Sequence, residues 1–140
     1  MSTKTFVNLP VKDLERSKAF FAKLGYSFNP QFTDERAACM VIGEDIYTML
    51  LSEPFFKTFT RKEIADAAKT TEVLVALSAD SRGQVDEMLL SALAAGAKEA
   101  REPMEYESMY GRSFEDLDGH IWEVFWMDPS AINQANTQNQ

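Results

Sequence analysis

The residues best suited to chemistry lie in the last third of the chain, around the acidic residue Glu123. In the segment IWEVFW, strand alternation places Glu123 on one face with Ile121 and Phe125. A carboxylate between apolar side chains loses hydration, which favours its neutral form unless a partner holds the charge. Glu123 is therefore predicted to be a catalytic acid or base. Two alternatives stay open: it anchors a cationic ligand, or it pairs with Arg112, Tyr47 or a backbone donor.

Three other residue types could take part in chemistry. Arg112 lies on the preceding strand, on one face with Phe114, where it could pair with Glu123, hold a ligand anion or lie in solvent. The single histidine, His120, falls in an Asp-Gly-His turn and is interpreted as a turn residue. The single cysteine, Cys39, lies in an apolar strand and is interpreted as a buried, unreactive thiol. The sequence shows no phosphate-binding glycine loop and no zinc-type spacing.

The composition limits the classes of partner. The chain has 140 residues and a formal net charge of -8, which argues against nucleic acids and anionic membranes. We expect one domain over residues 1–128 and a flexible tail over 129–140. No apolar run is long enough to span a membrane, and no signal peptide is recognised at the start. With a single cysteine, these features predict a cytoplasmic protein.

The chain follows one plan twice, over residues 4–52 and over residues 72–127. Each copy opens with an alternating apolar strand, FVNLPV in the first and VLVALS in the second. A helix is predicted after each strand. Asp13 and Ser81 are the expected N-caps of these helices, and Gly25 and Gly96 are expected just past their ends.

Strand-like segments follow each helix. Residues 37–42 and 46–51 predict a hairpin around Gly43-Glu44-Asp45, and GRSFEDL and IWEVFW predict another around Asp118-Gly119-His120. A further strand is expected within residues 26–32 and within residues 98–107. The predicted fold class is therefore α+β, with two βαβββ half-repeats whose mixed sheets curl around one another to form a cleft.

The connector of residues 53–71 does not fit the repeat. Thr60 with Glu63 predicts a capping box and a short helix that runs to about Ala68. Phenylalanines precede this helix at positions 55, 56 and 59. They could form a lid over the pocket, a dimer contact or a simple packing contact with the core.

Two stretches resemble a known family. VNLPVKDLERSKAFFAKLGY is similar to the opening strand, Asp-Leu cap and helix of the vicinal oxygen chelate superfamily, and GRSFEDLDGHIWEVFW is similar to its closing hairpin. This superfamily includes glyoxalase I, bleomycin-resistance proteins, fosfomycin-resistance proteins and extradiol dioxygenases. The resemblance covers roughly residues 4–127 and departs from the family pattern at Leu117, where a proline is usual.

The resemblance implies a divalent metal between the two sheets, held by His, Gln or Glu on the first and last strands of each half. The corresponding positions are Phe6, Thr48, Leu74 and Glu123, of which only Glu123 is a usual ligand type. Asn8 shares the face of Phe6 and could add a carbonyl, but one amide and one carboxylate make a weak site. The sequence therefore predicts no metal site and no cofactor.

The inward faces of the two sheets are expected to form an apolar pocket with a few polar points, which suits an organic ligand. The predicted lining is Phe6, Asn8, Thr48, Leu50, Leu74, Ala76, Glu123 and Phe125, with Arg112 as a further ligand contact.

Four hypotheses for the function follow. The first is a metal-free binder of a small organic molecule, similar to bleomycin-resistance proteins. The others are a lyase or dioxygenase with metal at a rearranged site, a metal-free enzyme that uses Glu123, and an interaction protein with Trp122 and Trp126 as an exposed contact face. Whether the chain is an enzyme stays open. A homodimer is expected in each case, because members of the superfamily commonly pair to complete their pockets.

Overall fold

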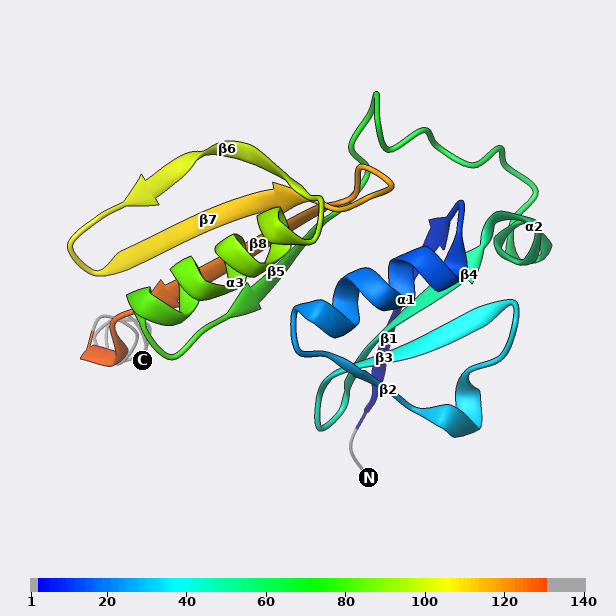
Figure 1. Ribbon diagram of the computed structural model, residues 1–140, viewed down its shortest axis with the longest axis horizontal. Helices are drawn as coiled ribbons and strands as arrows, with labels where there is room; N and C mark the ends of the chain where they lie inside the picture. Colours follow the sequence, from blue (N-terminus) through cyan, green and yellow to red (C-terminus); the bar gives the residue numbers. More distant parts are fainter. Residues whose placement is uncertain (1–2, 131–140) are drawn as a thin grey trace. The chain divides into compact units, whose positions relative to one another are not determined.

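The chain divides into two compact units, one up to Asp66 and one from Ala67. The computed structural model describes residues 3–130, and Figure 1 shows a mixed sheet and a helix in each unit. The boundary falls inside the predicted connector of residues 53–71. A single domain over residues 1–128 stays a prediction, and most of the predicted tail, from residue 131 onward, lies outside the described residues.

The first unit contains a four-stranded sheet in the order β1-β4-β3-β2. Strand β1 (Thr5–Val11) pairs in parallel with β4 (Ile46–Ser52). Strand β3 (Ala37–Gly43) runs antiparallel to β4 and also to the short β2 (Ser27–Phe28). The hairpin predicted around residues 43–45 is confirmed as the β3–β4 connection.

The second unit repeats this topology with the order β5-β8-β7-β6. Strand β5 (Leu74–Ser78) pairs in parallel with β8 (Ile121–Met127), which runs antiparallel to β7 (Met109–Glu115). Strand β6 (Lys98–Glu105) forms the far edge beside β7. Because strand order and strand direction agree in both units, the predicted α+β fold with two half-repeats is confirmed.

The two main helices start and stop where their capping residues predict. Asp13 accepts a hydrogen bond from the backbone N–H of Arg16 at the start of α1 (Leu14–Lys23). Ser81 accepts one from the N–H of Gln84 at the start of α3 (Arg82–Ala94). Gly25 and Gly96 follow the helix ends with φ of +100° and +112°, a conformation that favours glycine.

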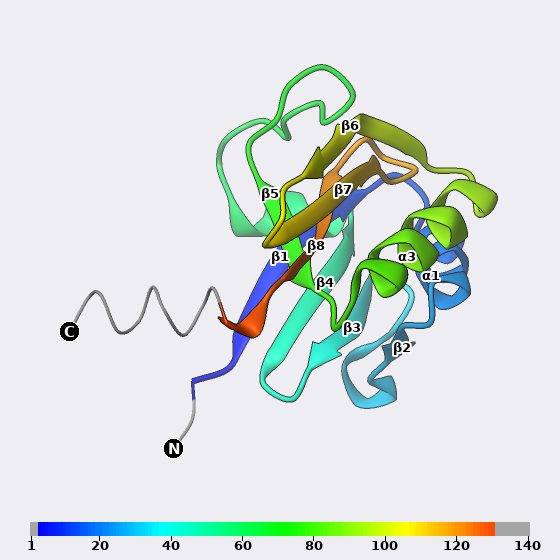
Figure 2. The same cartoon turned by 90° about the vertical axis from the view of Figure 1, so that its left-hand side faces the viewer.

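Each helix covers one face of its own sheet and so closes a core. Helix α3 lies along β7 and β8 (Figure 2), and α1 packs on β3 and β4. The core of the first unit contains Leu9, Val11, Leu14, Phe20, Phe21, Met40 and Leu50. The core of the second unit contains Val85, Leu89, Ala92, Phe114, Trp122 and Val124. Each large side chain buried in this way contributes about 1.5–3 kcal/mol.

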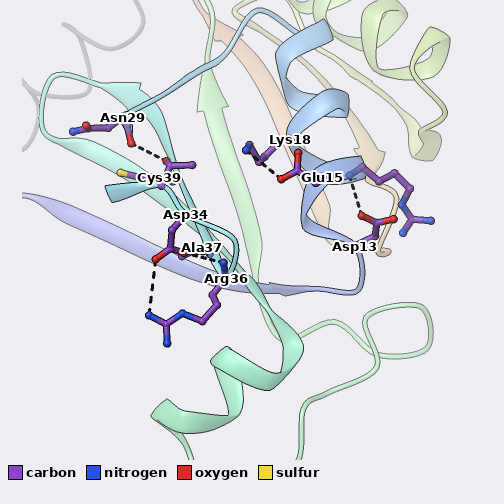
Figure 3. A network of polar contacts seen from close by, with 10 residues as sticks. Asp13, Glu15, Lys18, Asn29, Asp34, Arg36, Ala37 and Cys39 are labelled. Atoms are coloured by element: carbon purple, nitrogen blue, oxygen red, sulfur yellow. Dashed lines mark hydrogen bonds and ion pairs between the residues drawn. The ribbon is translucent and has the colours of Figure 1, made fainter. Parts of the chain in front are cut away.

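Loops of the first unit are held by short side-chain contacts. The Asp34 carboxylate accepts from the N–H groups of Arg36 and Ala37, directly before β3 (Figure 3). Asn29 caps a 3-10 turn at Pro30–Phe32 and donates its backbone N–H to the Cys39 carbonyl. The strand expected within residues 26–32 is therefore limited to Ser27–Phe28, because the capped proline turn ends it.

The connector differs from its prediction. Its helical part comes earlier, as α2 (Glu53–Phe56) and a 3-10 turn at Lys57–Phe59, and Pro54 suits that first helical turn. The helix predicted over residues 60–68 is wrong, because the Thr60 hydroxyl accepts from Lys62 in a local turn. Helix α2 packs against β1 and β4, whereas Phe59 is exposed, and the role of the phenylalanines as a lid, a dimer contact or a packing contact stays a prediction. No helix within residues 3–130 is long and apolar enough to cross a membrane.

The β7–β8 hairpin is anchored by the buried carboxylate of Asp116. Its oxygens accept from the backbone N–H groups of Asp118 and His120 and from the indole N–H of Trp122. Burial raises the pKa of the Asp116 carboxyl. Gly119 in the turn has φ of +92°, and a Cβ there would lie 2.8 Å from the carbonyl oxygen of Ala67. His120 is a turn residue, as predicted.

We expect Asp116→Ala to lower the free energy of unfolding by about 1–3 kcal/mol, because it leaves buried N–H donors without an acceptor. Urea denaturation followed by tryptophan fluorescence measures the loss. Glu87→Ala, on the exposed side of α3, is the control and should change stability by less than about 0.5 kcal/mol. Equal effects of the two substitutions would show that Asp116 does not anchor the hairpin.

Candidate functional site

A row of paired residues crosses the sheet of the second unit on the face opposite α3. Arg101 of β6 pairs in register with Ser113 of β7, Ser113 with Glu123 of β8, and Glu123 with Ala76 of β5. Residues in register share a face, so three polar side chains form one line that ends at the small Ala76.

An ion pair joins the two charged members of this row. The Nη2 atom of Arg101 lies 3.1 Å from Oε1 of Glu123, and the two side chains are 35% and 26% exposed. Arg101 also donates from Nη1 to the carbonyl oxygen of Glu102 at 3.3 Å. A charge-assisted hydrogen bond of this kind is stronger than a neutral one. The partner that Glu123 requires is therefore Arg101, rather than Arg112, Tyr47 or a backbone donor.

The ion pair forms part of the wall of a cavity of about 250 Å³. The other walls are mostly apolar: the thioethers of Met104, Met109 and Met127, and the ring of Phe125. Two small residues, Ala76 and Gly111, leave open space beside these apolar side chains. Glu123, Phe125 and Ala76, all predicted as pocket residues, line this one cavity together, whereas Arg101, Met104 and Met127 were not predicted.

Ser113 adds a polar group to the row. Its side chain is fully buried, and its hydroxyl oxygen has no hydrogen-bond partner within residues 3–130. Buried hydroxyls almost always have a partner, so this one stands out. It lies on the central strand between Arg101 and Glu123.

Arg112 lies on the α3 side of the same sheet. Its guanidinium donates to Asp86 of α3 at 3.2 Å and to Glu99 of β6 at 2.9 Å. The Tyr110 hydroxyl also donates to Asp86, at 2.5 Å, and this hydrogen bond together with Arg112 holds the pKa of Asp86 below its usual range. The predicted pairing of Arg112 with Glu123 is therefore wrong, because strand alternation places the two on opposite faces.

The tryptophans do not form an exposed contact face. Trp122 is fully buried between the sheet and α3. Trp126 lies under the Arg82 guanidinium at 5.1 Å, and Arg82 also donates to the carbonyl oxygen of Tyr106. The hypothesis of an interaction surface built on Trp122 and Trp126 is therefore wrong.

In the first unit, the predicted pocket residues lie on two faces. Phe6 and Asn8 are exposed, but Thr48 and Leu50 are buried on the side of α1, because they pair in register with Val7 and Leu9. The prediction that Thr48 and Leu50 share the face of Phe6 is wrong. The predicted register is one residue out of phase, and such a slip exchanges the two faces.

The face of Phe6 continues on β4 with Tyr47 and Met49. The rings of Phe6 and Tyr47 stack with centroids 4.8 Å apart and an interplanar angle of 11°. In the second unit, Leu74 pairs with Ile121 on the face of Glu123, as expected, and is half exposed.

The side chains at the metal positions of the resembled superfamily do not fit a divalent metal. Phe6 and Leu74 offer no lone pair, and neither Thr48 nor the thioether of Met49 is a usual ligand for such ions. Glu123 is the one carboxylate of the set, and a guanidinium already holds its Oε1 atom. Within the described part of the chain, no group of three His, Cys, Asp or Glu side chains could hold a metal ion.

The single cysteine is not a candidate nucleophile. Cys39 is fully buried in β3, and burial raises the pKa of its thiol. A buried thiol of raised pKa forms little thiolate, so the predicted buried, unreactive state agrees with the structure.

The chain is similar to a known protein-family model and to several solved structures. Residues 3–43 match the family model described as bleomycin resistance protein-like N-terminal. A hypothetical protein from S. aureus has 26% sequence identity, with a TM-score of 0.76 over 90% of this chain and 94% of that chain. The chain has the glyoxalase/bleomycin-resistance fold. The predicted resemblance to the vicinal oxygen chelate superfamily is confirmed at the level of the fold.

Two further solved structures share this fold at lower identity. A glyoxalase/bleomycin resistance protein/dioxygenase family enzyme from Burkholderia phytofirmans is 15% identical, with a TM-score of 0.76 over 90% of this chain and 99% of that chain. The fosfomycin resistance protein FosX from Mesorhizobium loti is 18% identical, with a TM-score of 0.68 over 95% and 98%. A search of curated proteins found no match.

The lowered pKa of Asp86 predicts that this residue makes the free energy of unfolding depend on pH. A carboxyl with a depressed pKa in the folded state adds stability above its unfolded pKa of about 3.9, and this stability is lost as the pH falls. The stability difference between the wild type and Asp86→Asn should therefore be largest near neutral pH and should shrink below about pH 4. Urea denaturation across pH 3–7 measures it, with Glu87→Gln as the exposed control. A difference that stays constant over this range would contradict the assignment.

The unpartnered hydroxyl of Ser113 predicts an unusual outcome for a buried polar residue. Ser113→Ala should leave the free energy of unfolding unchanged or raise it, because no hydrogen bond is lost. The same change at the N-cap, Ser81→Ala, should cost about 1 kcal/mol. Thermal unfolding of both variants makes the comparison, and a loss at Ser113 as large as at Ser81 would reveal a hydrogen bond there.

Proposed function

We propose that the chain binds a small organic molecule, without a metal, in the cavity of the second unit. The observation that carries this proposal is the pairing of Glu123 with Arg101 at the edge of an apolar cavity. The guanidinium provides the positive charge that the carboxylate needs there, so the site requires no metal cation for charge balance. The mixture of apolar walls and few polar groups is typical of small-molecule sites.

The metal-dependent alternative has less support from this chain's own residues. A lyase or dioxygenase with metal at a rearranged site needs several nitrogen or carboxylate donors that converge. Among the described side chains that line the cavity, Glu123 is the one carboxylate, and the other charged group is the Arg101 guanidinium. A guanidinium is a cation and cannot act as a ligand.

The use of Glu123 as a metal-free acid or base is the second candidate. It needs a carboxylate that reaches a bound molecule, and the Oε2 atom of Glu123 accepts no hydrogen bond from residues 3–130. Loss of turnover in Glu123→Gln, with binding retained, would favour this role over simple binding.

The biological role that we propose is sequestration of a drug-like compound. Bleomycin resistance is named in the family model that matches residues 3–43, and fosfomycin resistance in the name of a solved protein with the same fold. We further propose a cytoplasmic homodimer that binds neither nucleic acid nor membranes, as the acidic charge and the resemblance suggest. Sedimentation at several protein concentrations tests the self-association.

Elemental analysis of the purified protein without a tag tests the metal-free part of the proposal. We expect well below one equivalent of metal, and no thermal stabilisation by added Zn²⁺, Ni²⁺, Mn²⁺ or Fe²⁺. About one bound equivalent that raises the unfolding temperature would contradict the proposal.

Calorimetric titration tests the location of binding. The probes are naphthalene compounds that differ in one head group, titrated in the presence of EDTA. We expect at least one probe to bind. Gly111→Val should lower the affinity for that probe about tenfold or more, because a side chain at position 111 enters the cavity beside Phe125. Gly83→Ala, in α3 on the other face, is the control and should have no effect. Binding that is insensitive to Gly111→Val would place the ligand elsewhere.

A further inference from the structure

We infer that the cavity of the second unit selects an electrically neutral ligand that carries a hydrogen-bond donor and an acceptor side by side, such as a primary amide or a lactam, on an apolar ring system. This inference rests on the proposed function and specifies the class of its ligand.

The first argument is charge. The chain as a whole carries a formal charge of -8, which by itself favours a cationic ligand. The charged side chains that line the cavity are one arginine and one glutamate, and they are paired at 3.1 Å. A formally charged ligand at this pair meets one partner of opposite charge and one of like charge, so the attraction is largely cancelled while the ligand's own charge loses hydration, which costs binding free energy. A neutral ligand leaves the pair intact.

The second argument is the set of open hydrogen-bonding positions. The Oε1 atom of Glu123 accepts from Arg101, which leaves Oε2 as an acceptor. Arg101 uses one N–H toward Glu123 and one toward the Glu102 carbonyl, and a guanidinium has five. An acceptor therefore lies next to donors along the row, and the complementary head group has a donor next to an acceptor. The carboxamide group has this arrangement.

The third polar residue of the row, Ser113, has an unpartnered hydroxyl. It is buried on β7, in register with both charged residues, and it can donate or accept. Its side chain is fully buried and does not line the cavity, so the polar groups of this row that a ligand reaches are those of Arg101 and Glu123. Sites that hydrogen-bond a ligand group strongly reject analogues that lack it.

The walls define the rest of the ligand. Three methionines and Phe125 surround the space, and methionine side chains adapt to irregular apolar shapes and contact aromatic rings favourably. A volume of about 250 Å³ is slightly below the range of about 300–1,000 Å³ for ligand sites, which suits one or two fused rings. The cavity therefore tolerates different ring systems and distinguishes head groups.

The test compares four naphthalene probes by calorimetric titration: 2-naphthamide, 2-acetonaphthone, 2-naphthoate and 2-naphthylmethylammonium. We expect the amide to bind about tenfold more tightly than each of the other three, because it alone is neutral and has both hydrogen-bonding functions. If a charged probe binds best and Gly111→Val still weakens it, the neutral-ligand inference fails while the proposed function stands. If no probe responds to Gly111→Val, the proposed function itself fails.

Charge variants provide a second, independent test. Glu123→Gln leaves the arginine unpaired, so the preference should move to 2-naphthoate, and Arg101→Met leaves the glutamate unpaired, so it should move to 2-naphthylmethylammonium. Each relative affinity should change by about tenfold. Combining the two substitutions should abolish both preferences for charge. Glu87→Gln removes one negative charge on the α3 side and should leave the ranking unchanged. A ranking that is the same in all variants would overturn the inference, and thermal unfolding verifies that each variant is folded.

Discussion

The ion pair between Arg101 and Glu123 is the interaction on which the site depends. A carboxylate on a strand with Ile121 and Phe125 cannot be left without a partner at low cost. A fold of this kind could meet that need with a metal or with a side-chain cation. Here the cation is a guanidinium 3.1 Å away, and it belongs to the chain itself. Charge balance at the cavity is therefore built into the sequence, which is why we propose metal-free binding.

The position of this pair follows from the register of the sheet. Arg101 and Glu123 lie on strands separated by β7, and both align with Ser113. A slip by one residue on either strand would move a charge to the α3 side. That side already holds its own network, in which Arg112 binds Asp86 and Glu99. The two faces of one sheet thus separate a structural charge network from the polar row of the cavity.

The sequence predicted the two main helices from local signals, but a local capping pattern at Thr60 predicted a helix that does not form, and the faces that depend on distant strands were predicted less well. Caps such as Asp13 and glycine stops such as Gly25 depend on a few neighbouring residues, so helix bounds and the repeat were predicted correctly. The faces of β5 and β8 also followed from alternation. The face of Thr48 required the register between β1 and β4, which no local pattern contains. Arg101 was missed because two irregularities interrupt the pairing of β6 with β7, so that alternation along β6 does not reveal its face.

A double-mutant cycle on folding stability tests the central claim most directly. It compares the wild type with Arg101→Met, with Glu123→Gln and with the double variant by urea denaturation at neutral pH. The account predicts a favourable coupling of about 1 kcal/mol, which falls as the salt concentration rises because part of it is electrostatic. Additive effects, with no coupling between the two positions, would show that Arg101 does not hold the Glu123 carboxylate and would remove the basis for a metal-free site.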